Sequence, residues 1–217
     1  FLALGLIQAA CFDGADLKAW SSRNPKDNRK GLGDPEARVG RGPEGFYLGY
    51  RSLLLIDMEG LPLGHVEAPA NVNEKDLVEP VLNDALGWDM EVEAVAGDSQ
   101  LESKTVFQKL ENRKIAHVIP WRKLKGRTNP PEVLTVKDKI TVEGPEHLKI
   151  TYGRLRAAAE WFMSTLKTQL GYDNYTWKGL DNTSIHTSLA ICLIYAVAIA
   201  AFKMGKPEQA RSIAYFK

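Results

Sequence analysis

The chain has 217 residues, of which 44% are apolar and 25% are charged, and its formal net charge is +1. This composition excludes a largely disordered chain, and the length has room for one large domain or two small ones. Two cysteines, Cys11 and Cys192, exclude a disulfide framework and favour a reducing compartment such as the cytoplasm. The longest apolar run, at 189–202, is shorter than the roughly 20 residues that a membrane span needs. We therefore expect a buried helix there and no membrane association.

The first third of the sequence predicts strands around a long loop. Residues 6–13 are short and mostly apolar and end in Phe-Asp, which is typical of a strand. Residues 21–45 are rich in Gly, Pro, Asn, Asp and charge. They predict a long loop, which in a compact domain is usually a functional one near the site. Residues 46–57 and 61–68 are aromatic and aliphatic runs separated by a short turn, so they predict a hairpin.

The next segment predicts a helix and then a strand. In residues 73–86 the apolar positions follow helical spacing, but Pro80 stands inside the pattern. Because proline lacks an amide proton, the helix either starts near Glu79 or kinks at Pro80. Residues 91–96 predict a strand that ends at Gly97-Asp98.

The rest of the chain adds three helices and one strand. Ser99 followed by Glu102 forms a capping box, which predicts a helix start. Residues 115–119 predict a short strand, and residues 154–171 and 183–204 predict helices. This order of elements predicts one α/β domain over the whole chain, 1–217, with helices packed on a central mixed sheet.

Charge is unevenly distributed along the chain. Residues 52–112 hold 13 acids against three bases, whereas residues 113–178 hold 13 bases against six acids. Residues 120–150 read as a basic loop or insertion, and the tightest basic run in it contains no acid. That run consists of Arg122, Lys123, Lys125 and Arg127. A concentrated positive stretch fits the phosphates of a nucleic acid, and a solvated loop remains the alternative.

Two aspartates follow apolar runs that we expect to be interior strands. Asp13 follows Ala-Cys-Phe, and Asp98 follows Ala-Val-Ala-Gly. A carboxylate at such a position is costly unless it is solvated, paired or bound to a metal ion. Loops at strand ends carry the sites of many open α/β sheets, so both aspartates are candidate site residues. A turn or helix-cap aspartate is the alternative for each, above all for Asp98, which precedes a predicted helix.

The predicted helix 154–171 has a polar edge beside its apolar stripe. Glu160 lies off that stripe, with Arg156 four residues before it and Lys167 seven residues after it. At helical spacing all three side chains line one edge of the helix. An exposed Arg156–Glu160 ion pair, worth about 0.2–0.5 kcal/mol, would explain two of them without any function.

Several short segments occur in a recognisable order. The run Phe12-Asp13-Gly14-Ala15-Asp16 is followed by Gly49-Tyr50-Arg51, by the segment 69–74 (PANVNE), and then by Ala96-Gly97-Asp98. In their order and spacing these segments resemble the catalytic boxes of DDE transposases from bacterial and archaeal insertion sequences. Where that family has a tyrosine shortly after the second aspartate, this chain has Leu101.

The last box of the family reads Tyr, two residues, Arg, three residues, Glu, six residues, Lys. The chain has Arg156, Glu160 and Lys167 at that spacing. The tyrosine position is Gly153, and Tyr152 stands one residue early. The resemblance covers nearly the whole chain, from about residue 12 to residue 202, and keeps all three acids.

The resemblance implies a fold similar to ribonuclease H, with a mixed five-stranded sheet and helices on both sides. It implies that Asp13, Asp98 and Glu160 are the catalytic acids and together bind two Mg²⁺ or Mn²⁺ ions. Hard carboxylate oxygens suit such ions, and two metal ions activate the attacking oxygen and stabilise the leaving oxygen of an in-line displacement at phosphorus. It also implies that Arg156 and Lys167 contact DNA phosphates near the scissile bond.

The activity implied is cleavage of transposon ends and strand transfer into target DNA. The implied partner is double-stranded DNA, bound by a homodimer in a prokaryotic cytoplasm. Two other functions stay open: a ribonuclease H-like nuclease that only hydrolyses, and an inactive transposase-derived DNA-binding protein. Relatives carry a helical DNA-binding region before the first strand. Asp13 stands near the start of this sequence, so we expect that region to be absent.

Overall fold

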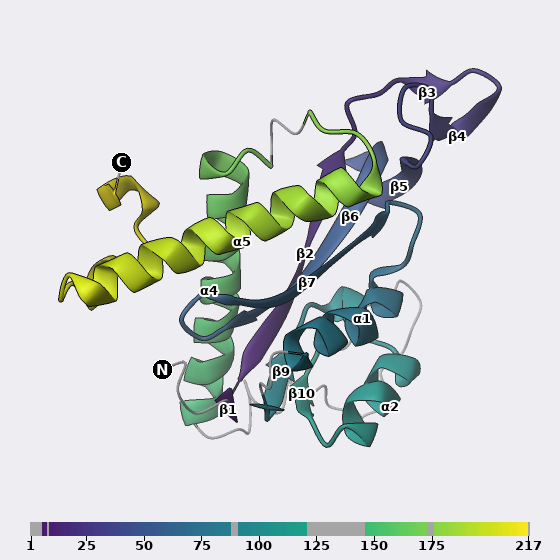
Figure 1. Ribbon diagram of the computed structural model, residues 1–217. Coiled ribbons are helices and arrows are strands. Elements are labelled where there is room, and N and C mark those ends of the chain that lie inside the picture. The colour runs from purple at the N-terminus through teal and green to yellow at the C-terminus, as the bar shows by residue number, and fades with distance from the viewer. Residues whose placement is uncertain (1–5, 8, 88–90, 121–145, 173–175, 217) are drawn as a thin grey trace.

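An eight-stranded mixed sheet forms the centre of the molecule, with helices on both of its faces (Figure 1). The computed structural model describes residues 6–7, 9–87, 91–120, 146–172 and 176–216. The strands of the sheet are β2 (Ala10–Lys18), β3 (Arg23–Asn24), β4 (Asp27–Gly31), β5 (Arg38–Gly42), β6 (Gly45–Asp57), β7 (Pro62–Pro69), β9 (Ala94–Ala96) and β10 (Ala116–Val118), while β1 (Leu6–Ile7) and β8 (Glu91–Val92) form a separate pair. The helices are α1 (Glu74–Leu86), α2 (Lys104–Asn112), α4 (Glu146–Gln169) and α5 (Leu180–Lys203), with 3-10 turns η1 (Ser99–Leu101), η3 (Pro207–Gln209) and η4 (Ile213–Phe216).

The long strands β2 and β6 are central to the sheet. They pair antiparallel along the whole of β2, from Ala10 opposite Asp57 to Lys18 opposite Gly49. On the other side of β2, the short strands β9 and β10 follow in parallel. The first part of β6 pairs with β5, which leads on to β4 and β3, and the rest of β6 pairs with β7. The predicted α/β class, a mixed sheet flanked by helices, is confirmed.

Residues 21–45, which we expected to form a long loop beside the site, instead form β3, β4 and β5. The prediction was wrong because glycine in this region marks close packing rather than a loop. A Cβ atom on Gly40, within β5, would lie 2.2 Å from the carbonyl oxygen of Ala70. The three strands extend the sheet beyond β6, on the side away from β9, so the sheet has eight strands and not five. The predicted hairpin of residues 46–57 and 61–68 is confirmed as β6 and β7.

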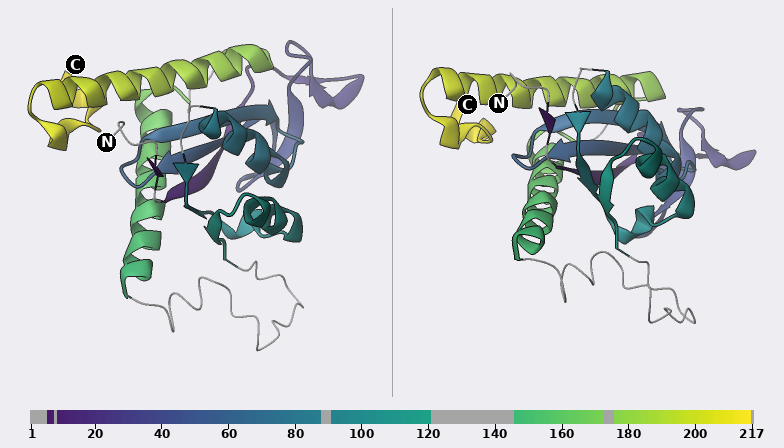
Figure 2. Two further views of the ribbon diagram at one scale, coloured as in Figure 1. Left: turned by 60° about the horizontal axis from the view of Figure 1, so that its bottom comes forward. Right: turned by 90° about the horizontal axis from the view of Figure 1, so that it is seen from below.

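Alternate residues of β2 face two different hydrophobic cores. Cys11, Ala15 and Leu17 pack into a core that α4 and α5 cover. Ala10 and Phe12 pack into a second core, which α1 and α2 cover on the opposite face. Figure 2 shows the sheet between these two pairs of helices. Burial on both faces explains why the central strands are apolar at nearly every position.

Helix α1 begins at Glu74, where the side chain of Asn73 accepts a hydrogen bond from the backbone N–H of Lys75. The alternative of a start near Glu79 is therefore wrong. Pro80 lies inside the helix, in its second turn. The cap at Asn73 decides the start, because a side-chain oxygen satisfies one of the amide groups that the first turn leaves without a partner.

Helix α2 begins at Lys104, later than the predicted capping box. The side chain of Ser103 accepts from the backbone N–H of Thr105 and caps α2. Residues Ser99–Leu101 form the separate turn η1, which Asp98 caps. The prediction of a capping box at Ser99 is therefore wrong, because a different serine serves as the N-cap. The predicted strand 91–96 and strand 115–119 are confirmed as β8 with β9 and as β10.

Helix α5 is longer and less buried than the core helix that we predicted. Ala190, Ile194 and Val197 pack into the core beneath it. The opposite face exposes the large side chains Ile185, Leu189, Leu193, Ile199 and Phe202. By length and composition α5 could cross a membrane, because its most apolar stretch of 18 residues has a mean hydropathy of 2.1. Of that stretch, 33% is buried. The predicted burial is therefore correct for one face only.

Candidate functional site

Asp13 lies on β2, and Asp98 follows the neighbouring parallel strand β9, close enough for its charge to raise the pKa of Asp13. In the pairing of β2 with β9, Cys11 lies opposite Ala96. Each aspartate is the second residue after its member of this pair, so continuing the register past Ala96 sets Asp98 beside Asp13. The pairing of β2 with β9 therefore brings the two acidic boxes together, although they are far apart in the sequence.

The two aspartates differ in their local structure. Asp13 lies within β2, opposite Leu54 of β6, and the strand continues to Lys18. The prediction that the strand ends at Asp13 is therefore wrong. Asp98 follows β9 closely and is exposed, and its carboxylate accepts a hydrogen bond from the backbone N–H of Ser99. The helix-cap role that we kept as the alternative for Asp98 is thus present.

Arg156 of α4 joins Asp13 to Glu160. Its guanidinium lies 3.7 Å from Oδ1 of Asp13 and 3.4 Å from Oε1 of Glu160. The Arg156 and Asp13 side chains are mostly buried, whereas the side chain of Glu160 is 67% exposed. The predicted i, i+4 ion pair is therefore present, but it has a third member from the central strand. This third contact distinguishes the site from an isolated surface pair.

Tyr152 lies on the same face of α4, one helical turn before Arg156. Burial raises the pKa of the Tyr152 hydroxyl, Arg156 lowers it, and the charges of Asp98 and Glu160 raise it further. Tyr152 is therefore close enough to these groups to be affected by their charge. Gly153, which occupies the tyrosine position by motif spacing, is exposed, and a Cβ atom there would meet nothing within 4 Å.

The site has a net excess of carboxylates around one guanidinium. Burial raises the pKa of Asp13, the charges of Glu160 and Asp98 raise it further, and Arg156 lowers it. Burial lowers the pKa of Arg156, but Asp13 and Cys11 raise it more, so the guanidinium stays charged. Burial also raises the pKa of the Cys11 thiol to about 12. Cys11 is therefore a protonated core residue and not a nucleophile.

A second polar cluster lies on the α1 side of β2. Arg51 lies 3.2 Å from Oδ1 of Asp16 and 3.7 Å from Oε1 of Glu74. A Cβ atom on Gly14 would lie 2.8 Å from Glu74 Oε1, so glycine at this position leaves room for the carboxylate. Burial raises the pKa of Glu74, Arg51 lowers it, and Asp16, Asp98 and Asp13 raise it further. We assigned no role to Glu74 or Asp16 from the sequence, although both stand within segments that carry the resemblance, 69–74 and 12–16.

The donor set of the site has the chemistry of a divalent cation site. In the part of the chain that the structure describes, no three His, Cys, Asp or Glu side chains are positioned to hold a metal ion. The guanidinium of Arg156 contacts both Asp13 and Glu160 instead. Carboxylate oxygens are suitable ligands for Mg²⁺ or Mn²⁺, and the excess negative charge is what a cation would neutralise. In this arrangement the guanidinium of Arg156 balances the charge of Asp13 and Glu160 in the place that a cation would take.

The remaining predicted residues fall into two groups. Lys167 lies exposed on α4, two turns after Glu160. The predicted helix 154–171 is confirmed within α4, with Arg156, Glu160 and Lys167 along one edge of it. The basic run lies outside the residues that the structure describes. It comprises Arg122, Lys123, Lys125 and Arg127.

Residues 6–196 match the sequence profile of a family described as "Transposase DDE domain". The matched segment begins in β1 and ends within α5, so it contains both polar clusters and every strand of the sheet. A search of curated proteins found no match.

Proposed function

This chain belongs to the family of transposases with a DDE domain, and we propose from that premise that it cleaves transposon ends and joins them to target DNA. Its mixed sheet, flanked by helices on both faces, has the ribonuclease H-like architecture of such enzymes. The proposed catalytic acids are Asp13, Asp98 and Glu160, and the whole chain acts as one catalytic domain. We expect it to work in a prokaryotic cytoplasm, at the nucleoid.

One observation supports these roles more than any other. Asp13 and Asp98 are neighbours through the register of β2 and β9, and Arg156 links Asp13 to Glu160. Acids that are far apart in the sequence thus lie close enough to Asp13, on the central strand β2, for their charges to act on it. An isolated helix-cap aspartate or a surface ion pair does not need this convergence.

Members of this family normally use divalent metal ions, and the residues to hold them here are Asp13, Asp98 and Glu160. When bound, two Mg²⁺ or Mn²⁺ ions would activate the attacking oxygen and stabilise the leaving oxygen in displacement at phosphorus. The protein supplies the three carboxylates, with Asp13 within β2 and Asp98 in the turn that follows β9. Glu160 completes the set from α4, where its exposed side chain is free to turn toward the strands.

Arg156 and Lys167 are the proposed contacts to the DNA backbone beside the acids. The fork of the Arg156 guanidinium suits two oxygens of one phosphate, and Lys167 supplies a single positive charge. In this proposal Arg156 leaves the carboxylates when cations replace it and takes a phosphate oxygen instead. We also propose that the basic run of Arg122, Lys123, Lys125 and Arg127, in the segment 120–150 that the sequence identifies as a basic loop or insertion, contacts the DNA backbone.

The catalytic roles are tested by removing each charge while keeping the shape of the side chain. We expect Asp13→Asn, Asp98→Asn and Glu160→Gln each to abolish Mg²⁺-dependent cleavage of duplex DNA. Glu111→Gln, at an exposed acid near the end of α2, is the control and should cleave like the parent. Cleavage at the parental rate by any of the first three variants would remove that residue from the proposed set.

A second measurement separates transposition from simple hydrolysis. Joined products between a donor duplex and a labelled target duplex are expected for a transposase, whereas a nuclease produces nicks only. An inactive DNA-binding protein would bind the duplex and give neither product. A rise in melting temperature on addition of Mg²⁺, lost in Asp13→Asn, would show metal binding without any need for activity.

The exposed face of α5 supports the proposal that the protein acts as a homodimer. Its apolar residues recur at alternating spacings of four and three, the pattern of a helix–helix seam. They are Ile185, Leu189, Cys192, Ala196 and Ile199. Asp181 lies at the start of α5 and Lys203 at its end. Antiparallel pairing with α5 of a second copy would therefore bring opposite charges together at both ends of the seam.

Sedimentation equilibrium tests the dimer with and without DNA. Leu189→Glu places a charge in the middle of the seam and should give a monomer. Phe46→Glu, at an exposed apolar side chain of β6 away from the seam, should leave the dimer intact. A parent that is monomeric both alone and on DNA would contradict the proposal.

A further inference from the structure

The part of the sheet farthest from β9 is a projecting basic surface. Residues 23–41, here called the basic wing, comprise β3, β4 and most of β5, and Figure 1 shows β3 and β4 extending beyond the body of the molecule. The wing holds six bases and three acids. Five of the bases are exposed, namely Arg23, Lys26, Arg29, Lys30 and Arg41. The surface of the wing is therefore strongly positive, although the whole chain is nearly neutral.

Two of the three acids in the wing accept hydrogen bonds from backbone N–H groups at the start of α5. Asp34 is buried and accepts hydrogen bonds from the hydroxyl of Tyr50 and the backbone N–H of Gly179. Glu36 accepts from the backbone N–H of Leu180, at the first residue of α5. These carboxylates hold the wing against the start of the helix. They leave Asp27, which pairs with Arg29 and Lys30, as the single acid among the bases of the projecting part of the wing.

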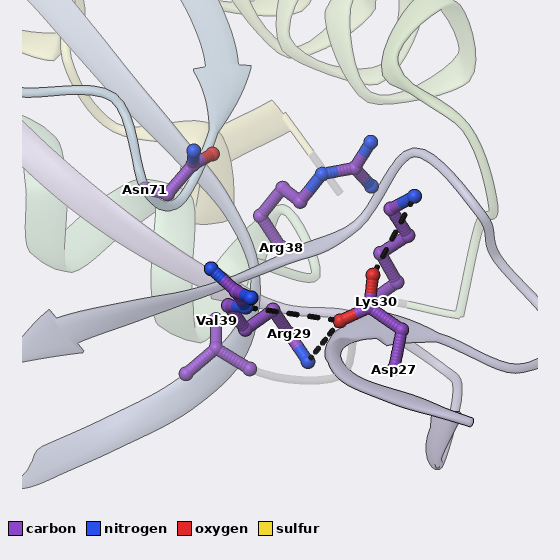
Figure 3. Close-up of a pocket in the computed structure, with 6 residues that line it drawn as sticks. All are labelled: Asp27, Arg29, Lys30, Arg38, Val39 and Asn71. Carbon is purple, nitrogen blue, oxygen red and sulfur yellow. Dashed lines mark hydrogen bonds and ion pairs between the residues drawn. The ribbon is translucent and has the colours of Figure 1, made fainter. Parts of the chain in front are cut away.

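The third acid, Asp27, pairs with basic side chains that line a pocket. Figure 3 shows this pocket, which is lined by Asp27, Arg29, Lys30, Arg38, Val39 and Asn71. Asp27 lies 3.5 Å from Nζ of Lys30 and accepts a hydrogen bond from the backbone N–H of Arg29. Three cations against one carboxylate leave a net positive charge around the pocket. An anion such as a phosphate oxygen fits this lining, because Arg, Lys and Asn are all hydrogen-bond donors.

The wing lies within reach of a duplex held at the catalytic acids. Lys30 pairs across the sheet with Arg38, Arg38 with Gly49, and Gly49 with Lys18, which lies at the far end of the strand that carries Asp13. Strand spacings of about 4.8 Å and rises of about 3.3 Å per residue place Lys30 roughly 20 Å from Asp13. That distance corresponds to about six base pairs of DNA. A duplex that is held at the acids and runs toward β4 would therefore reach the wing within about six base pairs.

We propose that the basic wing is a second binding surface for double-stranded DNA, which grips the phosphate backbone about six base pairs from the catalytic acids. This inference rests on the proposed function, because it takes DNA as the partner. The hairpin of β3 and β4 is a two-stranded ribbon, an element that a DNA groove admits. Its arginine and lysine side chains contact phosphates, so the wing adds affinity and fixes the path of the duplex without reading base sequence.

The test is an anisotropy titration of the full chain against a labelled duplex in EDTA, at several salt concentrations. The wing variant changes Arg23, Lys26 and Arg29 to Gln, and a control variant changes Lys104, Lys114 and Lys206 to Gln. All six side chains are exposed, and both variants lose three positive charges. We expect the wing variant to bind roughly tenfold more weakly or worse, with a salt slope lower by up to about 2.7 units. The control should keep the parental slope.

Lysine acetylation read by mass spectrometry gives an independent readout. Duplex DNA should protect Lys26 and Lys30 from an amine-reactive reagent, and Lys114, between α2 and β10, should react equally with and without DNA. Melting curves of both variants should match the parent, since the exchanged side chains lie on the surface.

The outcomes separate the wing from the proposed function. A parent that binds DNA while the wing variant keeps its affinity and slope would overturn the wing alone. Equal losses in the wing and control variants would overturn it as well, because net charge would then explain both. A parent that binds no DNA would overturn the proposed function together with the wing.

Discussion

The hydroxyl of Ser188 lies 3.0 Å from Nε2 of His65, and Nδ1 of the same ring lies 3.0 Å from Oε2 of Glu67. Glu67 is buried and also accepts from the hydroxyl of Ser52. This chain of polar groups ties α5 to β7. Ser188 stands in the middle of α5, where backbone N–H groups bond within the helix, so no oxyanion donors face its hydroxyl. We therefore interpret the arrangement as structural and not as a hydrolytic triad.

The first prediction concerns the pH dependence of stability through His65. Burial lowers its pKa, but the hydrogen bond and charge of Glu67, with the charge of Asp84, raise it more, so the pKa lies above 6.5. The protonated ring is then favoured in the folded state. Its stabilisation is fully present below pH 6.5 and is lost as the pH rises through the raised pKa.

We expect His65→Asn to lower the free energy of unfolding by about 1–3 kcal/mol near pH 6, because Glu67 loses a buried partner. The fall in stability between pH 6 and pH 9 should also become shallower than in the parent. Urea unfolding across this range measures both effects. Ser188→Ala, which keeps the ring and Glu67, should retain the parental pH dependence, and an unchanged slope in His65→Asn would contradict the assignment.

The second prediction concerns Asp57, at the turn between β6 and β7. Burial raises its pKa to about 6, although the backbone N–H groups of Leu61 and Glu59 lower it. The folded state therefore favours the protonated form. Stability from this group is fully present below pH 3.8 and is lost as the pH rises through 6.

Asp57→Asn removes the buried charge and keeps an oxygen that can accept from Glu59 and Leu61. We expect this variant to be more stable than the parent by about 1–2 kcal/mol at pH 8, with the difference vanishing near pH 4. The same exchange at exposed Glu59 is the control. Chemical denaturation at both pH values decides the matter, and equal gains at pH 4 and pH 8 would exclude the titration of Asp57 as the cause.

The third prediction separates Tyr152 from its neighbour Gly153. Tyr152 lies on the face of α4 that carries Arg156 and Glu160, whereas Gly153 is exposed with open space around it. Tyr152→Ala should reduce DNA cleavage by roughly tenfold or more, because the side chain that packs beside Arg156 is lost. Gly153→Ala should cleave normally and stabilise the helix by about 0.5–1 kcal/mol. The reverse pattern would mean that motif spacing, and not the helix face, identifies the functional position.

The fourth prediction uses a glycine at the contact between β7 and α1. A Cβ atom on Gly64 would lie 2.9 Å from the backbone N of Ala85 and 2.9 Å from the carbonyl oxygen of Val81. Since backbone atoms cannot turn aside, Gly64→Ala should destabilise the protein by about 1–3 kcal/mol. Thermal unfolding should therefore show opposite signs for Gly64→Ala and Gly153→Ala.

The central elements could be predicted from local pattern. The apolar runs of β6 and β7 and the helical spacing around Glu160 depend on residues close in sequence, so they are visible without a structure. The strands β4 and β5 were hidden because Gly40 looks like a turn residue, and the reason for it is the distant backbone of Ala70. Local composition cannot show such a contact.

The candidate site, too, could be predicted where it depends on local spacing and not where it depends on distant contacts. The spacing of Asp13 and Asp98 along the sequence matched a family pattern. The structure gives the physical reason, because the pairing of Cys11 with Ala96 brings the two segments together. Glu74 was missed because nothing in its own segment shows that the first turn of α1 packs beside Gly14 of β2. Tyr152 was seen as one residue out of place, although its spacing of four from Arg156 already set both on one helix face.

The bridge from Arg156 to Asp13 has a consequence for biosynthesis. Asp13 and Asp98 leave the ribosome long before α4, so an incomplete nascent chain has two neighbouring aspartates with neither the third acid nor the arginine that contacts Asp13. Docking of α4 supplies Glu160 and Arg156 in one event and at the same time covers the core of Cys11 and Leu17. Under the proposed function, a truncated chain without α4 lacks both Glu160 and one side of this core, and we expect it to leave the host genome uncut.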